Sequence, residues 1–277
     1  MKQLTANRAN KLLYNFIKVN NIAGKVLLPA NVCPDVVKTL QLAGLSVQFL
    51  DLQAETLCMN QEAALHEAKD ANMLIFVHTY GIEYEFTAFF QQLREVNPNL
   101  IIVDDKCLCL PDLDVKDSAA DLVLYSNGEK KMVNLGGGAI GYLADQWEYD
   151  EVAVEGCDCL SNELWLLDPK QLYLKMDTII AHKEKLNAVY RANLPENIQL
   201  PDAFQHWRFN ILVQNKEEIL AALQAEGLAA ESVYASQSEE CLLASNLHAY
   251  VINLYNDKSF TLEQAEKVCE VINQYVY

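Results

Sequence analysis

The chain has 277 residues, 51% of them hydrophobic and 21% charged, which is enough to bury a full core in a globular protein. Its formal net charge is −17, from 38 acidic and 21 basic residues, and this charge argues against binding to a phosphate backbone or to an anionic membrane surface. We therefore expect neither nucleic acid nor a membrane as a partner.

The first residues, Met1 to Arg8, contain no apolar stretch typical of a signal peptide. No run approaches the roughly 18 apolar residues of a membrane-spanning helix. The chain has 8 cysteines, too few for a disulfide framework at this length. These features predict a cytoplasmic protein with reduced thiols.

Helical and strand patterns alternate from the start of the chain to about residue 145. Periodicity predicts helices at residues 11–19, 34–42, 61–68 and 86–96. Short apolar runs predict strands at residues 25–28, 46–50, 73–77, 100–103, 122–125 and 139–143. Apolar strands that alternate with helices are typical of a mainly parallel sheet covered on both faces, so we predict a three-layer α/β/α fold.

The pattern changes beyond residue 145. Residues 146–168 are irregular and acidic, and a long helix is predicted at residues 169–193. There follow a strand at 209–213, a helix at 216–226, a possible strand near Tyr234, a strand at 250–254 and a helix at 261–275. We therefore predict a large cofactor-binding domain at residues 1–168, and a linking helix with a smaller C-terminal α/β domain at residues 169–277.

Polar residues stand at the ends of neighbouring predicted strands. Asp104 and Asp105 close one strand, and Ser126 ends the next, five residues before Lys131. Ligands of parallel α/β sheets bind beyond the carboxyl ends of the strands, where His78 also falls. An acid and a lysine so placed suit pyridoxal phosphate, because its ring nitrogen stays protonated beside a carboxylate and a lysine holds its aldehyde as an imine.

The neighbours of these residues leave alternatives open. Lys130 stands beside Lys131, and either lysine could be the one that reacts. Asp104 stands beside Asp105, and because successive residues of a strand point in opposite directions, only one carboxylate can face a cofactor ring. We expect the reactive lysine to have a lowered pKa, which burial and the positive environment of the cofactor would supply.

Two cysteine pairs suggest a possible metal site. They are Cys107 with Cys109 and Cys157 with Cys159. Structural zinc sites more often place two to four residues between paired cysteines, so these pairs indicate zinc only weakly. We expect small core thiols and no metal.

The order and spacing of these motifs resemble the DegT/DnrJ/StrS family of sugar aminotransferases, which have the aspartate aminotransferase fold. The similarity covers nearly the whole chain. The segments that carry it are Val26 to Pro29, Cys33-Pro34, Ala43-Gly44, Val47 to Asp51, Val77 to Gly81, Val103 to Asp105, Tyr125 to Lys131, Gly137-Gly138, Trp207 to Val213 and Leu223 to Gly227.

The resemblance implies a pyridoxal phosphate site. Lys131 is similar to the family's Schiff-base lysine, Asp105 to the partner of the pyridinium nitrogen, and Ser126 to a serine that helps to hold the phosphate. Asn7 and Arg8 fall at a turn whose backbone N–H groups and helix dipole would hold the phosphate as well. Arg8 could alternatively be solvated.

His78 ends the predicted strand at residues 73–77 and is expected to approach the cofactor or merely to close the strand.

Three features depart from the family pattern. Asn7 replaces the glycine of the phosphate turn, and we expect the family's N-terminal extension to be missing. Leu108 stands where the family often has glutamine or histidine near the phenolic oxygen of the cofactor. Residues 31–33 replace an aromatic side chain that commonly stacks on the cofactor ring.

The resemblance implies transfer of an amino group, with glutamate as a donor, to a keto sugar nucleotide in polysaccharide biosynthesis. Dehydration of a sugar is less favoured, because related dehydratases have histidine in place of the lysine. It also implies a homodimer, in which we expect the aromatic segment Trp147 to Trp165 to pack against the partner near the cofactor. The three departures leave an alternative open: a catalytically degenerate homodimer of the same fold with a binding or regulatory role.

Overall fold

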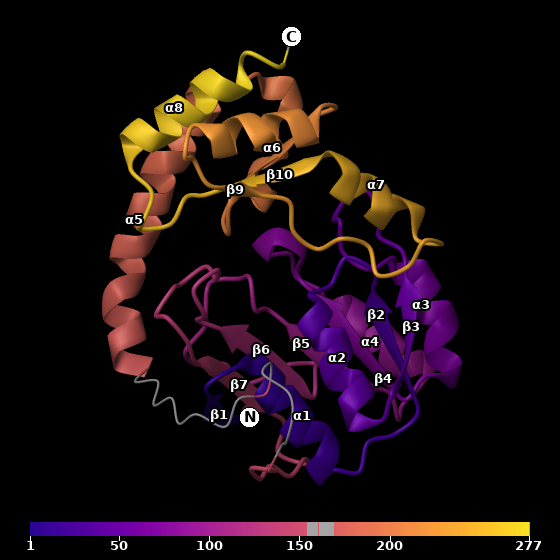
Figure 1. Cartoon of the computed structure of the whole chain (residues 1–277). Helices are drawn as coiled ribbons and strands as arrows, with labels where there is room; N and C mark the ends of the chain where they lie inside the picture. Colours follow the sequence, from indigo (N-terminus) through magenta and orange to yellow (C-terminus); the bar gives the residue numbers. More distant parts are fainter. Residues whose placement is uncertain (154–159, 161–168, 277) are drawn as a thin grey trace.

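The computed structural model describes residues 1–153, 160 and 169–276. Two β-sheets organise the chain, one of seven strands and one of three (Figure 1). No helix among the described residues is long and apolar enough to cross a membrane.

The larger sheet is mainly parallel, as the sequence predicts. Its strands in chain order are β1 (Lys2–Ala6), β2 (Lys25–Pro29), β3 (Ser46–Leu50), β4 (Met73–Val77), β5 (Ile101–Asp105), β6 (Leu122–Ser126) and β7 (Ala139–Leu143). They lie in the order β1-β7-β6-β5-β4-β2-β3, and only β1 and β7 pair antiparallel with their neighbours. The sequence does not predict β1, which pairs along one edge with β7.

Helices cover both faces of this sheet, and the alternation of side chains along the strands decides which face is which. Met73 and Ile75 of β4 belong to the core formed with α1 (Ala9–Val19) and α2 (Pro34–Ala43). Leu74 and Phe76 belong to the opposite core, formed with α3 (Gln61–Glu67) and α4 (Thr87–Val96). The three-layer α/β/α architecture is therefore confirmed.

The smaller sheet is antiparallel and has its own core. Its strands are β8 (Phe209–Leu212), β9 (Ala230–Glu231) and β10 (Val251–Leu254), in the order β8-β10-β9. The helices α5 (Pro169–Asn193), α6 (Lys216–Ala225) and α8 (Leu262–Ile272) pack with it. Figure 1 shows α5 running from the larger sheet to the smaller one, with α6 and α8 on the far side of the smaller sheet.

One helix of the C-terminal half packs on the larger sheet. The helix α7 (Leu242–Tyr250), which the sequence does not predict, places Ala244 and Leu247 in the α3/α4 core. The carboxylate of Asp51, just after β3, accepts hydrogen bonds from the backbone N–H groups of Leu243 and Ala244 at 2.9 Å each. The division of the chain into two domains at residue 168 stays a prediction.

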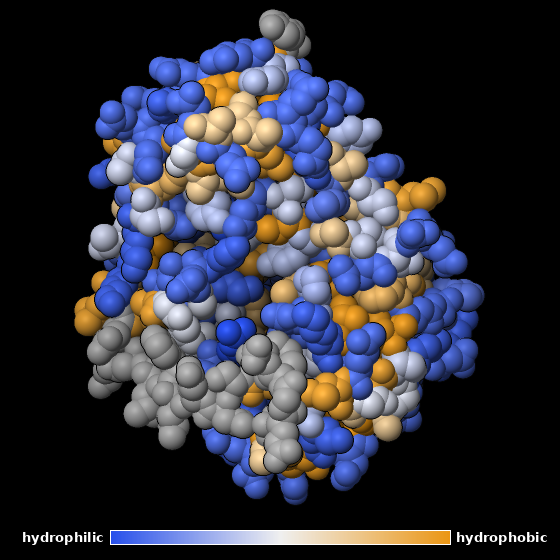
Figure 2. Space-filling model, in the orientation of Figure 1, coloured by the Kyte–Doolittle hydropathy of each residue, from blue (hydrophilic) through white to orange (hydrophobic). Residues whose placement is uncertain are grey.

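Polar residues predominate on the face of the molecule that Figure 2 shows, and apolar residues are scattered among them. This surface agrees with the net charge of −17.

Candidate active site

A pocket of about 500 Å³ opens at the carboxyl ends of the parallel strands. Small-molecule sites generally have volumes of about 300–1,000 Å³. The pocket is lined by residues from the N-terminal turn, from the loops after β2, β4, β5 and β6, and from the segment after β9. Those used below are Asn7, Arg8, Asn31, Cys33, Thr79, Asp105, Cys107, Leu108, Ser126, Lys130, Lys131, Gly136, Gly137, Gly138 and Tyr234.

The pleat of β5 separates the two adjacent aspartates. Asp105 lies on the α1/α2 side and lines the pocket, where its Oδ1 accepts a hydrogen bond from the backbone N–H of Cys107 at 3.0 Å. Asp104 points to the opposite face, where its Oδ1 lies 2.8 Å from Nε2 of His78. Asp105 is therefore the carboxylate available to a ligand in the pocket.

The structure places His78 outside this pocket. Its side chain is 2% exposed, and its two ring nitrogens face the Ile82 carbonyl oxygen at 2.8 Å and the Asp104 carboxylate at 2.8 Å. The ring belongs to the α3/α4 face because His78 continues the alternation of Phe76. Of the predicted site residues, Asn7, Arg8, Asp105, Ser126 and Lys131 come together and His78 does not.

The loop that carries the lysines folds back on its own glycines. The Asn127 N–H donates to the carbonyl of Gly138 at 2.8 Å, and the Gly138 N–H donates to the carbonyl of Asn7 at 2.9 Å. Gly136 and Gly138 have φ angles of 84° and 91°, a region that favours glycine because it has no Cβ atom. The glycines thus join the N-terminal turn to the lysine loop.

The two lysines have different surroundings. The Nζ of Lys130 donates to Oε1 of Glu231 at 2.6 Å, and the Lys130 side chain is 63% exposed. Lys131 is partly buried and faces Tyr234, Cys107 and Asp105. Lys131 is therefore the amine available inside the pocket.

Burial alone does not give the pocket lysine a lowered pKa in this structure. Desolvation by burial lowers the pKa of Lys131, but the Tyr234 hydroxyl, the Cys107 thiol and the Asp105 carboxylate raise it, and the net pKa lies above the usual value. The Lys131 amine is thus a protonated cation at neutral pH.

Tyr234 is a pocket residue that the sequence reasoning did not assign to the site. It lies beyond β9, not in a strand as predicted, and its φ angle of 63° is rare for a bulky residue. Its ring stacks on Trp207 with centroids 6.2 Å apart, and Nε1 of Trp207 donates to the carbonyl of Lys130 at 2.7 Å. No local pattern marks such a contact, because it joins segments far apart in the sequence.

Asn31 brings an unsatisfied polar atom to the pocket. It is 3% exposed, and its Nδ2 donates to Oγ1 of Thr79 at 3.2 Å and to the carbonyl of Leu57 at 3.4 Å. Its Oδ1 is buried without a hydrogen-bond partner. Because an unpaired buried acceptor costs free energy, this atom is suited to a donor on a bound ligand.

The predicted subunit-contact segment is described only in part, since residues 154–159 and 161–165 lie outside the described residues. Trp147 packs against Phe16 at 5.4 Å, the Tyr149 hydroxyl accepts a hydrogen bond from Asn15 at 3.0 Å, and Leu160 is 1% exposed. These three side chains make contacts within their own chain, Leu160 buried and Trp147 and Tyr149 partly buried. The packing of this segment against a partner stays a prediction.

The cysteine pairs are also described only in part. Cys107 and Cys109 are free thiols, whereas Cys157 and Cys159 lie outside the described residues. Within residues 1–153, 160 and 169–276, no group of three or more His, Cys, Asp or Glu side chains could hold a metal ion.

Solved structures share this architecture. A protein of Streptococcus pneumoniae assigned as a sugar aminotransferase, in its PLP form, is 14% identical with a TM-score of 0.80 over 100% of this chain and 88% of its own. A DegT/DnrJ/EryC1/StrS aminotransferase of Brucella abortus is 16% identical with a TM-score of 0.74 over 99% of this chain and 86% of its own. The chain has the fold of these aminotransferases.

The aminotransferase fold is also found in DesI, solved in the presence of its TDP-sugar product, at 15% identity and a TM-score of 0.76 over 99% of this chain and 80% of DesI. No protein-family model and no curated protein matches the sequence.

Proposed function

We propose that the chain is a pyridoxal-phosphate-dependent aminotransferase that acts on a keto sugar nucleotide. The observation that carries this proposal is the meeting of Lys131 and Asp105 in one pocket at the strand ends of an aminotransferase fold. The TDP-sugar product of DesI supports the substrate class. Glutamate as the donor, the cytoplasm as the location and a role in polysaccharide biosynthesis belong to the same proposal.

The pocket residues fit the cofactor. Asp105 would hold the protonated ring nitrogen, and the unpaired Oδ1 of Asn31 would accept from a donor on the cofactor or substrate. Ser126, the turn at Asn7 and Arg8, and the backbone of Gly136 to Gly138 would hold the phosphate. When bound, pyridoxal phosphate supplies an aldehyde that reacts with amines and a ring that accepts electron density.

The residues of the chain would handle protons and exclude water. Lys131 must release its ammonium proton before its Nζ can act as a nucleophile, and the freed Nζ can later carry a proton between substrate and cofactor carbons. The Asp105 carboxylate would keep the ring nitrogen protonated. Tyr234, which stacks on Trp207, lines the side of the pocket that faces the smaller sheet and would help to exclude water there.

The proposal is tested by adding pyridoxal phosphate to the purified protein. We expect a visible absorbance band, and borohydride reduction should fix the cofactor on the peptide that contains Lys131, as read by mass spectrometry. Amino transfer from glutamate to a TDP-keto sugar is then measured directly. A preparation that stays colourless and carries no added mass after reduction would contradict the proposal.

The second candidate, a degenerate binding or regulatory homodimer, is favoured by one observation. Leu108 brings an apolar side chain, 5% exposed, to the pocket wall, where it offers no hydrogen bond. A purified protein that binds no added pyridoxal phosphate would support this alternative.

The homodimer is a further part of the proposal. Light scattering at micromolar concentration should give about twice the chain mass of 31.2 kDa. We expect the dimer because a site at strand ends needs a cover, and the smaller sheet covers one side of it. A monomer under these conditions would contradict a site shared between two chains.

A further inference from the structure

The peptide group between the two lysines is held at both of its polar atoms. Its carbonyl oxygen, which belongs to Lys130, accepts a hydrogen bond from Nε1 of Trp207 at 2.7 Å. Its N–H, which belongs to Lys131, donates to the carbonyl of Gly128 at 3.1 Å. Because a peptide group is planar and its plane includes the next Cα atom, these two bonds orient the Cα of Lys131. The side chain that leaves this Cα lines the pocket.

Trp207, the donor to the lysine loop, is held by contacts from three other parts of the chain. It lies just before β8 and is 2% exposed. Its ring stacks on the rings of Tyr80, after β4, and Tyr234, after β9, with centroids 6.1 and 6.2 Å away. Its carbonyl oxygen accepts from Nζ of Lys183 in α5 at 2.8 Å. The indole N–H therefore comes from a buried side chain with a defined orientation.

The smaller sheet also contacts the lysine loop through Glu231, but at a different atom. Oε1 of Glu231 accepts from Nζ of Lys130 at 2.6 Å, and the Lys130 side chain is 63% exposed. Exposed ion pairs contribute little to stability, and this one leaves the backbone of the loop untouched. The bond from Trp207 acts on the backbone itself, one peptide group away from the side chain that lines the pocket.

We propose that Trp207 is a positioning residue of the site, whose indole N–H holds the peptide plane between Lys130 and Lys131 so that the Lys131 side chain enters the pocket. The importance of Lys131 rests on the proposed function. Two consequences follow from the contacts. Loss of the indole N–H should loosen the loop that carries Lys131. It should also slow the reaction of this lysine with an aldehyde in the pocket, without weakening the binding of the rest of the cofactor.

The first measurement uses the cofactor-free protein. In Trp207→Phe, hydrogen exchange of the peptide that contains residues 127–138 should be about fivefold faster, the factor that corresponds to the loss of one hydrogen bond. Trp147→Phe is the matched control, because Nε1 of Trp147 donates to Oδ1 of Asp121 at 2.8 Å and neither residue lines the pocket. Exchange of the same peptide in Trp147→Phe should match that of the wild type.

The second measurement compares pyridoxal phosphate with pyridoxine phosphate, which has an alcohol in place of the aldehyde. In Trp207→Phe the visible band with pyridoxal phosphate should form roughly 10- to 100-fold more slowly, because a misplaced amine meets the aldehyde less often. The Kd of pyridoxine phosphate should stay the same, since Asp105, Ser126 and the glycine loop are unchanged. Trp147→Phe should resemble the wild type with both ligands.

A second variant keeps the test decisive if Trp207→Phe does not fold. Replacement of Trp207 by β-(3-benzothienyl)alanine puts sulfur in place of the indole N–H and keeps the size of the ring, and it should give the same two results. Unchanged exchange in the Trp207 variants, or equal weakening of both ligands, would overturn the inference. A wild type that binds neither ligand would contradict the aminotransferase proposal, and hydrogen exchange would still decide whether Trp207 holds the loop.

Discussion

Replacing Lys131 by alanine should abolish the visible absorbance band formed with pyridoxal phosphate, whereas Lys130→Ala should keep it. The reason is geometric: Lys131 faces Asp105 inside the pocket, and Lys130 is paired with Glu231 at 2.6 Å on the exposed side of the loop. Loss of the amine that moves the proton should lower amino transfer by roughly 10²–10⁴-fold. Absorbance and turnover are measured on the same preparations.

The pH dependence of cofactor uptake provides a second measurement on the wild type. Burial lowers the pKa of Lys131, but Tyr234, Cys107 and Asp105 raise it above its usual value, so the neutral amine is a small fraction at neutral pH. At pH values below the pKa, the neutral fraction increases about tenfold for each unit by which the pH is raised. The rate of colour formation should increase by the same factor. A band that persists in Lys131→Ala but disappears in Lys130→Ala would reverse the assignment of the two lysines.

Much of the fold follows from patterns that are local in sequence. The strands at Ser46–Leu50, Met73–Val77 and Ala139–Leu143 have the predicted bounds. Met73–Val77 is a continuous apolar run because a central strand of a parallel sheet is buried on both faces. The strand β1 was not predicted because it is a short edge strand with only one buried residue, Leu4, and so has no apolar run. The helix α7 was missed because its capping group, Asp51, stands far away in the sequence.

Only those residues of the candidate site that follow directly from the ends of predicted strands could be predicted from the sequence. Asp105 and Lys131 follow from their places after β5 and β6, and the alternation along β5 then decides between Asp104 and Asp105. By the same alternation, the His78 side chain lies on the face of the sheet opposite to Asp105. The strand pattern alone could therefore have excluded His78 from the pocket. Tyr234 depends on the packing of the smaller sheet over the pocket, and no spacing in the sequence encodes that contact.

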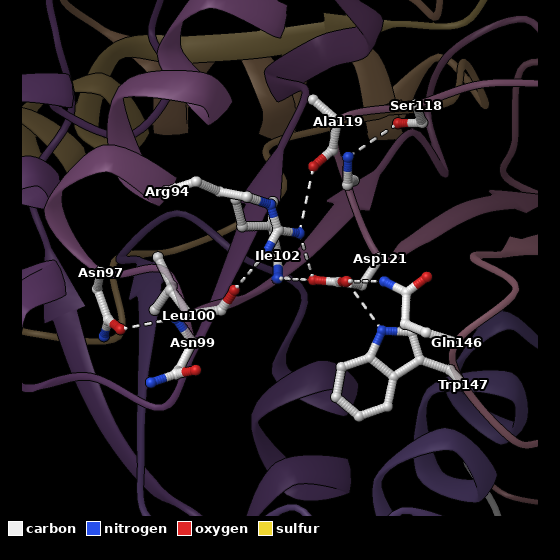
Figure 3. Close-up of polar contacts among 11 residues, drawn as sticks. Arg94, Asn97, Asn99, Leu100, Ile102, Ser118, Ala119, Asp121, Gln146 and Trp147 are labelled. Atoms are coloured by element: carbon white, nitrogen blue, oxygen red, sulfur yellow. Dashed lines mark hydrogen bonds and ion pairs between the residues drawn. The ribbon is translucent and has the colours of Figure 1, made fainter.

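Asp121 joins α4, β5 and the segment after β7 at the start of β6, and its loss should cause the largest change in stability. Figure 3 shows four donors around this carboxylate, which is 2% exposed and lies just before β6. Oδ2 accepts from Nη2 of Arg94 at 2.7 Å and from the Ile102 N–H at 2.8 Å. Oδ1 accepts from Nε1 of Trp147 at 2.8 Å and from Nε2 of Gln146 at 3.1 Å.

Asp121→Ala should lower the free energy of unfolding by about 3–5 kcal/mol, because it leaves the Arg94 charge and the N–H groups of Ile102 and Trp147 without their acceptor. Denaturant unfolding followed by circular dichroism measures this loss. Asp114→Ala is the matched control: the Asp114 side chain is 76% exposed and pairs with exposed Lys116 at 3.1 Å, so the change should stay within about 0.5 kcal/mol. Equal stability of the two variants would mean that the Asp121 contacts do not stabilise this part of the sheet. Asp121 lies outside the pocket, so folded Asp121→Ala protein should still bind the cofactor at low temperature, which separates the stability of the sheet from the chemistry at Lys131.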